Sequence, residues 1–126
     1  MSVKVTVNKF QINEALETLD KAAIDKFSQH RLEIGEEFVE ICTQYVPYDF
    51  ENKTPVHLAY QGHAYISESK DELKAVWSRT KNGFDVAYAQ YYGSYNHPYP
   101  RDGHWDQVAM YYKGDVFRKR VENILK

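Results

Sequence analysis

The sequence has one cysteine, no long apolar run and no strong excess of charge of either sign. Because Cys42 is the only cysteine among the 126 residues, an internal disulfide and a zinc site of several cysteines are excluded. No apolar run approaches the roughly 20 residues that span a bilayer, and the lysine-containing start lacks a secretory apolar core. We therefore expect a protein without a membrane partner that stays where it is made, in the cytoplasm.

Sequence signatures of common catalytic sites are also missing. There is no GxSxG, P-loop, GxGxxG or HExxH motif, and the paired carboxylates fall on stretches that are typical of solvated faces. His97 and His104 flank a proline-containing loop with Asp102 and Asp106 nearby, a composition that suits either a small metal-dependent enzyme or an ordinary polar loop. We predict no catalytic residue, no metal site and no cofactor, and keep an enzyme using His97 and His104 as the more distant alternative.

The size and composition are those of an ordinary globular protein. A chain of 14.8 kDa with 43% hydrophobic and 27% charged residues fits a single domain over residues 1–126. The net charge of −2 argues against a protein that works mainly by holding DNA phosphates. Tyrosine is the abundant residue, with 11 copies, and tyrosine is enriched at protein interfaces.

The first third of the chain predicts a short strand followed by helix. Valines alternate with polar residues over 3–7, the period-two pattern of a half-buried strand. From Ile12 onward the apolar residues recur at the three-and-four spacing of an amphipathic helix. A break near Thr18 to Lys21 divides this pattern into a short helix and a long one over Ala22–Gln44, about 35 Å in length. Pro47 disfavours helical geometry at the preceding residue and so ends this helix. Cys42 falls on the apolar stripe and is predicted to be buried.

The middle of the chain predicts a three-stranded antiparallel sheet. Its strands are expected over 57–67, 73–80 and 84–89, because apolar and polar residues alternate there. Asn82-Gly83 lies between the last two, and this pair is a strong signal for a two-residue hairpin. The resulting register places Trp77 opposite Tyr88 as a cross-strand aromatic pair.

The last third predicts a loop and a terminal helix. Residues 90–100 contain two prolines, a glycine and several tyrosines, which forbid a regular central strand. A helix is expected from Trp105 to Ile124, weakened in its middle by Gly114. Basic residues at its C-terminal end suit the helix dipole, and they leave a contact with DNA open without indicating specificity. The predicted class is α+β: a long N-terminal helix, a three-stranded antiparallel sheet with the Asn-Gly hairpin, and a C-terminal helix.

The tyrosine-rich loop over 88–101 has two interpretations. Aromatic rings beside a cation can stack single-stranded bases, and the same residues suit a protein interface. The negative net charge favours the interface. We predict contacts through aromatic side chains of this loop and of the loop over 47–55, namely Tyr48, Phe50, Tyr91, Tyr92, Tyr95 and Tyr99.

The order of these features resembles a known family. The chain is expected to contain, in order, a helix running into Tyr45-Val46-Pro47-Tyr48-Asp49, a hairpin, the segment Val86-Ala87-Tyr88-Ala89-Gln90-Tyr91-Tyr92-Gly93, a proline-containing loop and a helix that begins at Trp105-Asp106. This order resembles that of the minor capsid, or neck and tail-completion, proteins of long-tailed bacteriophages and prophages. The resemblance runs from about Ala22 to the C-terminus. One departure is clear, because Phe50-Glu51 replaces the Thr-Gly that follows the first segment in that family.

The resemblance implies a structural virion protein rather than an enzyme. It implies a homo-oligomeric ring, a hexamer or dodecamer, at the junction of head and tail, in contact with the connector or with tail proteins and without a cofactor. Such a protein joins heads to tails or completes the tail. The alternative role in the same phage neck is that of a tail terminator or another minor capsid protein.

Overall fold

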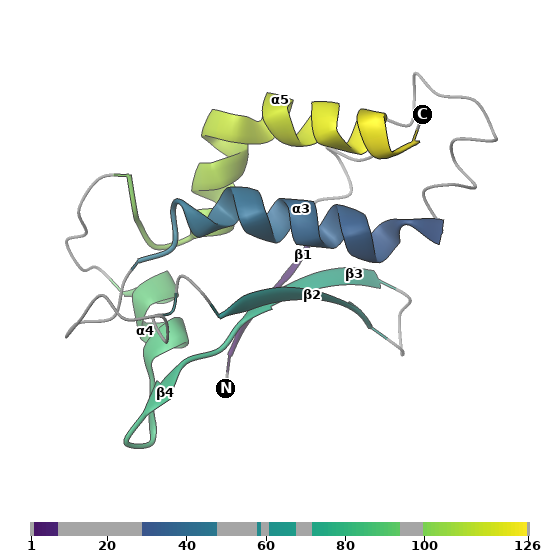
Figure 1. Ribbon diagram of the computed structural model, residues 1–126. Coiled ribbons are helices and arrows are strands. Elements are labelled where there is room, and N and C mark those ends of the chain that lie inside the picture. Colours follow the sequence, from purple (N-terminus) through teal and green to yellow (C-terminus); the bar gives the residue numbers. More distant parts are fainter. Residues whose placement is uncertain are drawn as a thin grey trace.

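The computed structural model describes residues 2–7, 29–47, 58, 61–67, 72–93 and 100–125. Within these ranges the elements follow in the order β1 (Val3–Thr6), α3 (Arg31–Thr43), β2 (Gly62–Ser67), β3 (Glu72–Trp77), β4 (Thr80–Lys81), β5 (Phe84–Asp85), α4 (Val86–Tyr92) and α5 (Trp105–Leu125). Figure 1 shows α3 lying on a sheet, with α5 running beside α3 in the opposite direction on the same side of that sheet. The predicted α+β class is confirmed.

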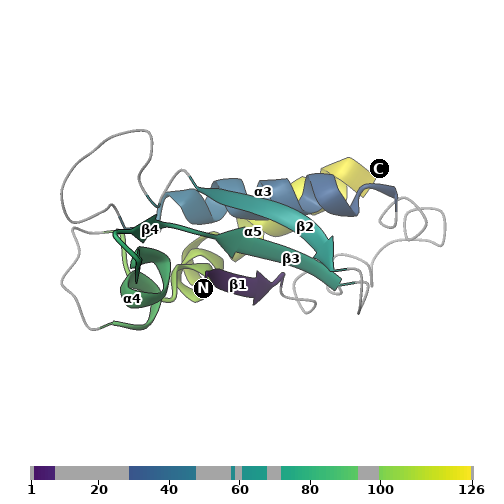
Figure 2. The same ribbon diagram turned by 90° about the horizontal axis from the view of Figure 1, so that it is seen from below.

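The sheet has three antiparallel strands in the order β1-β3-β2. Val3 pairs with Trp77 in β1–β3, and Ala64 pairs with Ala75 in β2–β3. Because side chains alternate between faces, one face carries the apolar residues that meet α3, while Lys4 and His63 lie on the other. The predicted strand at the N-terminus and a three-stranded antiparallel sheet are thus present. The view from below, in Figure 2, shows β1 and β2 as the two edges of this sheet.

The third strand of the sheet is β1, and not residues 84–89 as predicted. Asn82 and Gly83 have positive φ angles of 50° and 80° and form a two-residue turn, but the turn joins only the short strands β4 and β5. After Asp85 the chain becomes helical, because the Asp85 carboxylate accepts a hydrogen bond of 3.0 Å from the Tyr88 N–H and so caps α4. The predicted Asn-Gly hairpin within the three-stranded sheet, with Trp77 opposite Tyr88, is therefore wrong.

The long helix predicted over Ala22–Gln44 corresponds to α3, which covers only Arg31–Thr43. α3 begins at Arg31, after His30, whose backbone angles lie outside the helical range, and residues 8–28 lie outside the described part of the chain. Its end at Thr43, shortly before Pro47, agrees with the prediction. α5 covers the predicted range, and its backbone is non-helical at Lys113, one residue before Gly114.

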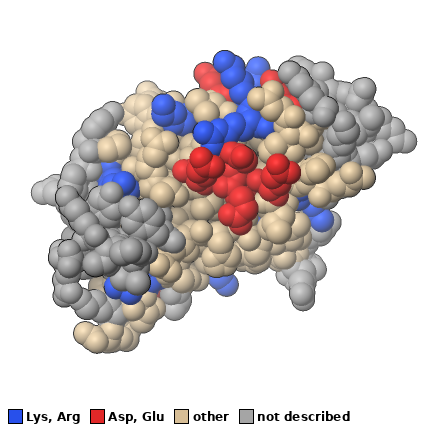
Figure 3. All heavy atoms as spheres, viewed as in Figure 1, with Lys and Arg blue, Asp and Glu red and all other residues tan. Residues whose placement is uncertain are grey.

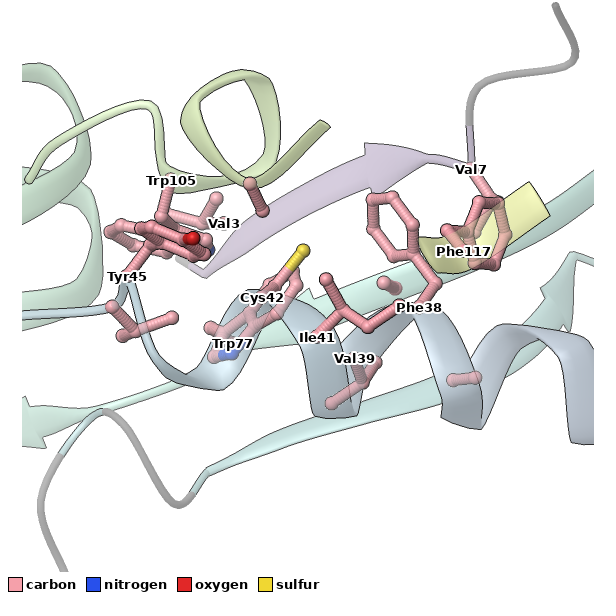
Figure 4. Packing of buried hydrophobic residues seen from close by; sticks show 14 of the residues in the cluster. Val3, Val7, Phe38, Val39, Ile41, Cys42, Tyr45, Trp77, Trp105 and Phe117 are labelled. Atoms are coloured by element: carbon pink, nitrogen blue, oxygen red, sulfur yellow. The ribbon is translucent and has the colours of Figure 1, made fainter. Parts of the chain in front are cut away.

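One hydrophobic core joins the helices and the sheet. Trp77 of β3 and Trp105 of α5 meet edge to face, with ring centroids 5.6 Å apart, and Phe38 meets Phe117 in the same manner at 5.6 Å. Cys42 lies fully buried between these aromatic pairs (Figure 4), as predicted. Burial raises the pKa of the Cys42 thiol, and the negative charge of Asp106 raises it further, so both effects favour the protonated thiol within the core.

Candidate interaction surface

Helix α4 separates its tyrosines between the core and the surface. Its buried residues Val86, Ala87, Gln90 and Tyr91 lie on one side. Tyr88 and Tyr92, which are four residues apart, lie on the other side with 46% and 56% of their surface exposed. Their rings are 4.7 Å apart. The predicted loop over 90–100 is therefore helical up to Tyr92, and the helix, not a loop, decides which tyrosines reach the surface.

Tyr91 is a core residue of this helix. Its side chain is 5% exposed, and its ring meets the Trp105 ring edge to face at 4.8 Å. Its hydroxyl donates a hydrogen bond of 2.6 Å to the Asp106 carboxylate. Burial, then the hydrogen bond and negative charge of Asp106, raise the pKa of the Tyr91 hydroxyl well above its usual range. Tyr91 therefore holds α4 against the start of α5.

His104 and Asp106, two of the residues of the possible enzyme site, both contact Tyr91. The His104 ring packs against Tyr91 and Tyr92 at centroid distances of 4.5 and 5.5 Å, and its φ angle of 48° places it at a tight turn before α5. The Asp106 carboxylate accepts the hydrogen bond from the Tyr91 hydroxyl. Among the described residues no group of three or more His, Cys, Asp or Glu side chains is arranged to hold a metal ion. His97 lies outside the described residues.

A shallow cavity lies between α4 and the first strand. Its volume is about 300 Å³, and it is lined by Tyr88 and Tyr92 on one side and by Ser2, Val3 and Lys4 on the other. Phe84, at the turn between β4 and β5, is 51% exposed. Tyr88 and Tyr92 form an aromatic surface beside the start of β1. Together with Phe84, which precedes α4 in the chain, we call them the α4 surface.

A second aromatic surface lies on α5. Tyr111 and Tyr112 are 82% and 56% exposed, and Val116, one turn further on, is 38% exposed. A cavity of about 420 Å³ lies beside them, lined by Pro100, Arg101, Asp102, Gln107, Val108, Tyr111 and Tyr112. The Tyr112 ring stacks on Tyr45 at 6.1 Å. We call this group, Tyr111, Tyr112 and Val116, the α5 surface.

Arg101 anchors the segment that leads into α5. Its Nη1 donates hydrogen bonds of 2.9 Å to the Thr43 carbonyl and 2.6 Å to the Val46 carbonyl. The Asp102 N–H donates a further bond of 2.9 Å to the Tyr45 carbonyl. Since carbonyl groups at a helix end have no partner within the helix, this guanidinium satisfies the end of α3 and suits its dipole.

The basic residues near the C-terminus are largely paired. Arg120 lies 2.9 Å from a Glu37 carboxylate oxygen and 3.6 Å from Glu40, and Arg118 lies 3.3 Å from Glu122. Figure 3 shows acidic side chains and basic side chains adjacent to each other on this face. Arg120 therefore joins α5 to α3, whereas the Arg118 pair lies within α5.

The predicted contact residues fall into three groups. Tyr92 is exposed, and Tyr91 is buried. Tyr48, Phe50, Tyr95 and Tyr99 lie outside the described residues. Phe84, Tyr88, Tyr111 and Tyr112 are exposed but were not among the predicted contact residues, although the helical spacing of Tyr88 and Tyr92 was a usable signal. Whether any of these residues contacts a partner stays a prediction.

The fold and the surfaces define a small α+β protein with two exposed aromatic groups on different helices. Comparison with models of protein families, with curated proteins and with solved structures found no match. None of the described helices is long and apolar enough to cross a bilayer.

Proposed function

We propose that this chain is a structural protein of the neck of a long-tailed phage, where it joins or completes the tail by assembling into a ring. The resemblance of its segments around Val46-Pro47 and over 86–93 to that family supports the proposal. The observation that carries it is the pair of aromatic surfaces on α4 and α5, because both expose tyrosine rings that are large enough to anchor a protein contact.

Two different surfaces are what a ring needs. A cyclic assembly of identical chains forms by head-to-tail contact, in which one patch of each subunit meets a different patch of the next. The α4 surface and the α5 surface are two such patches on one chain. The proposed assembly is a sixfold or twelvefold ring in the virion that contacts the connector or the tail. It needs no cofactor and no catalysis.

Two alternatives remain. A tail terminator or another minor capsid protein would use similar surfaces, and only the identity of the neighbouring ring separates these roles. A small metal-dependent enzyme would use His97 and His104. The contacts of His104 and Asp106 with Tyr91 provide a structural explanation for both residues, so no observation favours this alternative.

Light scattering of the purified protein, alone and with phage heads and tails that lack it, tests the proposal. We expect a closed ring, and joining of heads to tails that depends on the protein. Tyr92→Ser and Tyr111→Ser, one on each surface, should both weaken the ring, whereas Lys119→Gln, an exposed change elsewhere on α5, should not. A monomer that joins nothing would contradict the proposal.

A further inference from the structure

The two edges of the three-stranded sheet are not equivalent. On β2, the Ala64 N–H points away from β3 and donates a hydrogen bond of 2.9 Å to the Glu36 carboxylate of α3. A side chain of the helix thus occupies the middle of this edge. A strand added at β2 would have to displace that carboxylate.

Among the described residues, the main-chain groups on the outer side of β1 have no partner. Val7 donates its N–H to the Leu73 carbonyl at 3.0 Å, so the odd-numbered residues of β1 turn their main-chain groups toward β3. The main-chain groups of Lys4 and Thr6 then point outward, and no described residue pairs with them. Figure 2 shows β1 as the outermost strand on that side of the sheet. An unpaired strand edge of this kind is a template for another extended segment.

Positive charge lies along this open edge. Lys4 is exposed on β1 itself. The Lys74 ammonium group reaches β1 from the central strand and donates a hydrogen bond of 2.6 Å to the Thr6 hydroxyl. Both lysines belong to the face of the sheet that points away from α3. A strand paired with β1 would place every second side chain beside these two cations.

Aromatic surface adjoins the start of the same strand. The cavity of about 300 Å³ between Ser2–Lys4 and the tyrosines Tyr88 and Tyr92 begins where β1 begins. Exposed tyrosine rings that flank a strand edge provide apolar contact to a segment lying there. Main-chain pairing, charge and apolar contact therefore converge on one site.

We propose that the β1 edge binds an extended acidic segment of a partner protein as a fourth, antiparallel strand. Acidic side chains at alternate positions would face Lys4 and Lys74, and the residue beyond the start of β1 would contact Tyr88 and Tyr92. A second copy of the chain fits less well, because joining two β1 strands would bring the Lys4 and Lys74 charges of both copies onto one face. This inference goes beyond the proposed ring and does not depend on it.

A synthetic peptide of alternating Glu and Val, titrated into the full-length protein by calorimetry, tests this proposal. We expect binding that is lost when the Glu amide nitrogens are methylated and retained when the Val nitrogens are methylated, because only alternate main-chain groups face β1. A matched Lys and Val peptide should not bind.

Charge reversal on the protein gives an independent measurement. Lys4→Glu should weaken binding of the Glu and Val peptide about fivefold, whereas Lys119→Glu, the same change on α5, should leave it unchanged. Circular dichroism confirms that both variants fold. Equal binding of the two methylated peptides, unchanged affinity of Lys4→Glu, or a protein dimer that excludes the peptide would each overturn the proposal. The two peptide results do not bear on the ring, whose test is the mass of the protein without peptide, whereas a dimer in place of a ring would contradict both proposals.

Discussion

The Glu36 carboxylate of α3 accepts a hydrogen bond of 2.9 Å from the main-chain N–H of Ala64 on β2. This bond ties the helix to the edge of the sheet and satisfies a main-chain donor that β3 does not reach. It also occupies the middle of the β2 edge, which limits the pairing of that edge with another strand.

Removing this acceptor should weaken the fold. We expect Glu36→Ala to lower the free energy of unfolding by about 1 kcal/mol, since the Ala64 N–H then lacks its partner. Glu36→Gln keeps an acceptor oxygen at the same place and should lose less. Urea unfolding followed by circular dichroism measures both. Equal losses for the two variants would mean that charge, and not the hydrogen bond, matters at this position.

Two helical glycines should respond in opposite directions to alanine. A Cβ at Gly35 would lie 2.6 Å from the Ala64 Cβ and 2.8 Å from the Leu73 Cδ1, so Gly35→Ala forces α3 away from the sheet. Overpacking of this kind costs about 1–3 kcal/mol. A Cβ at Gly114 meets nothing within 4 Å, so Gly114→Ala should raise stability by about 0.5–1 kcal/mol. Thermal unfolding of both variants checks the pair, and a stabilised Gly35→Ala would contradict the close packing.

Arg101 should contribute more than an ordinary surface arginine. Arg101→Ala removes the donor that Thr43 and Val46 share, and we expect a loss of about 2 kcal/mol in the free energy of unfolding. The matched control is Arg118→Ala, which removes an exposed pair with Glu122 and should cost about 0.5 kcal/mol or less. Chemical unfolding under one buffer condition compares the two. Equal effects would refute the anchoring role of Arg101.

Stability should fall in alkaline solution because of Tyr91. Its pKa is raised in the folded protein by burial and by Asp106, so the folded state keeps a proton that the unfolded state loses above the ordinary tyrosine pKa of about 10. The stability that the hydroxyl contributes is therefore fully present below that pH and is lost as the pH rises above it.

Tyr91→Phe tests this linkage. The variant lacks the hydroxyl, so it should be less stable than the natural protein at neutral pH, where Asp106 loses a hydrogen-bond donor. The difference between the two proteins should shrink as the pH rises above about 10. Urea unfolding at a series of pH values measures it. Tyr92→Phe is the control, because Tyr92 is exposed, and a difference that stays constant with pH would contradict the assignment.

Local pattern and tertiary contact decided different parts of this protein. The strand at Val3–Thr6, the end of α3 before Pro47 and the helix from Trp105 could be predicted, because each depends on a short-range pattern of apolar residues or on the fixed geometry of proline. The burial of Cys42 followed from its place on an apolar stripe.

The third strand of the sheet could not be predicted from the local sequence pattern. Residues 84–89 alternate like a strand, yet the edge of β3 is taken by β1, whose Thr6 lies 68 residues before its partner Lys74. With that edge filled, the Asp85 side chain caps a helix instead of continuing a hairpin. Pairing between distant segments therefore overrode the β propensity of this segment.

The amino-acid sequence by itself determined the class of the fold, the C-terminal end of α3, the range of α5 and the abundance of tyrosine. Only the tertiary structure decided which tyrosines remain available. Consecutive residues on α4 point in different directions, so Tyr91 is buried against Trp105 while Tyr92 reaches solvent. The same packing gave β2 the carboxylate of Glu36, because α3 lies over that side of the sheet. Among the described residues, the outer main-chain groups of β1 have no such partner.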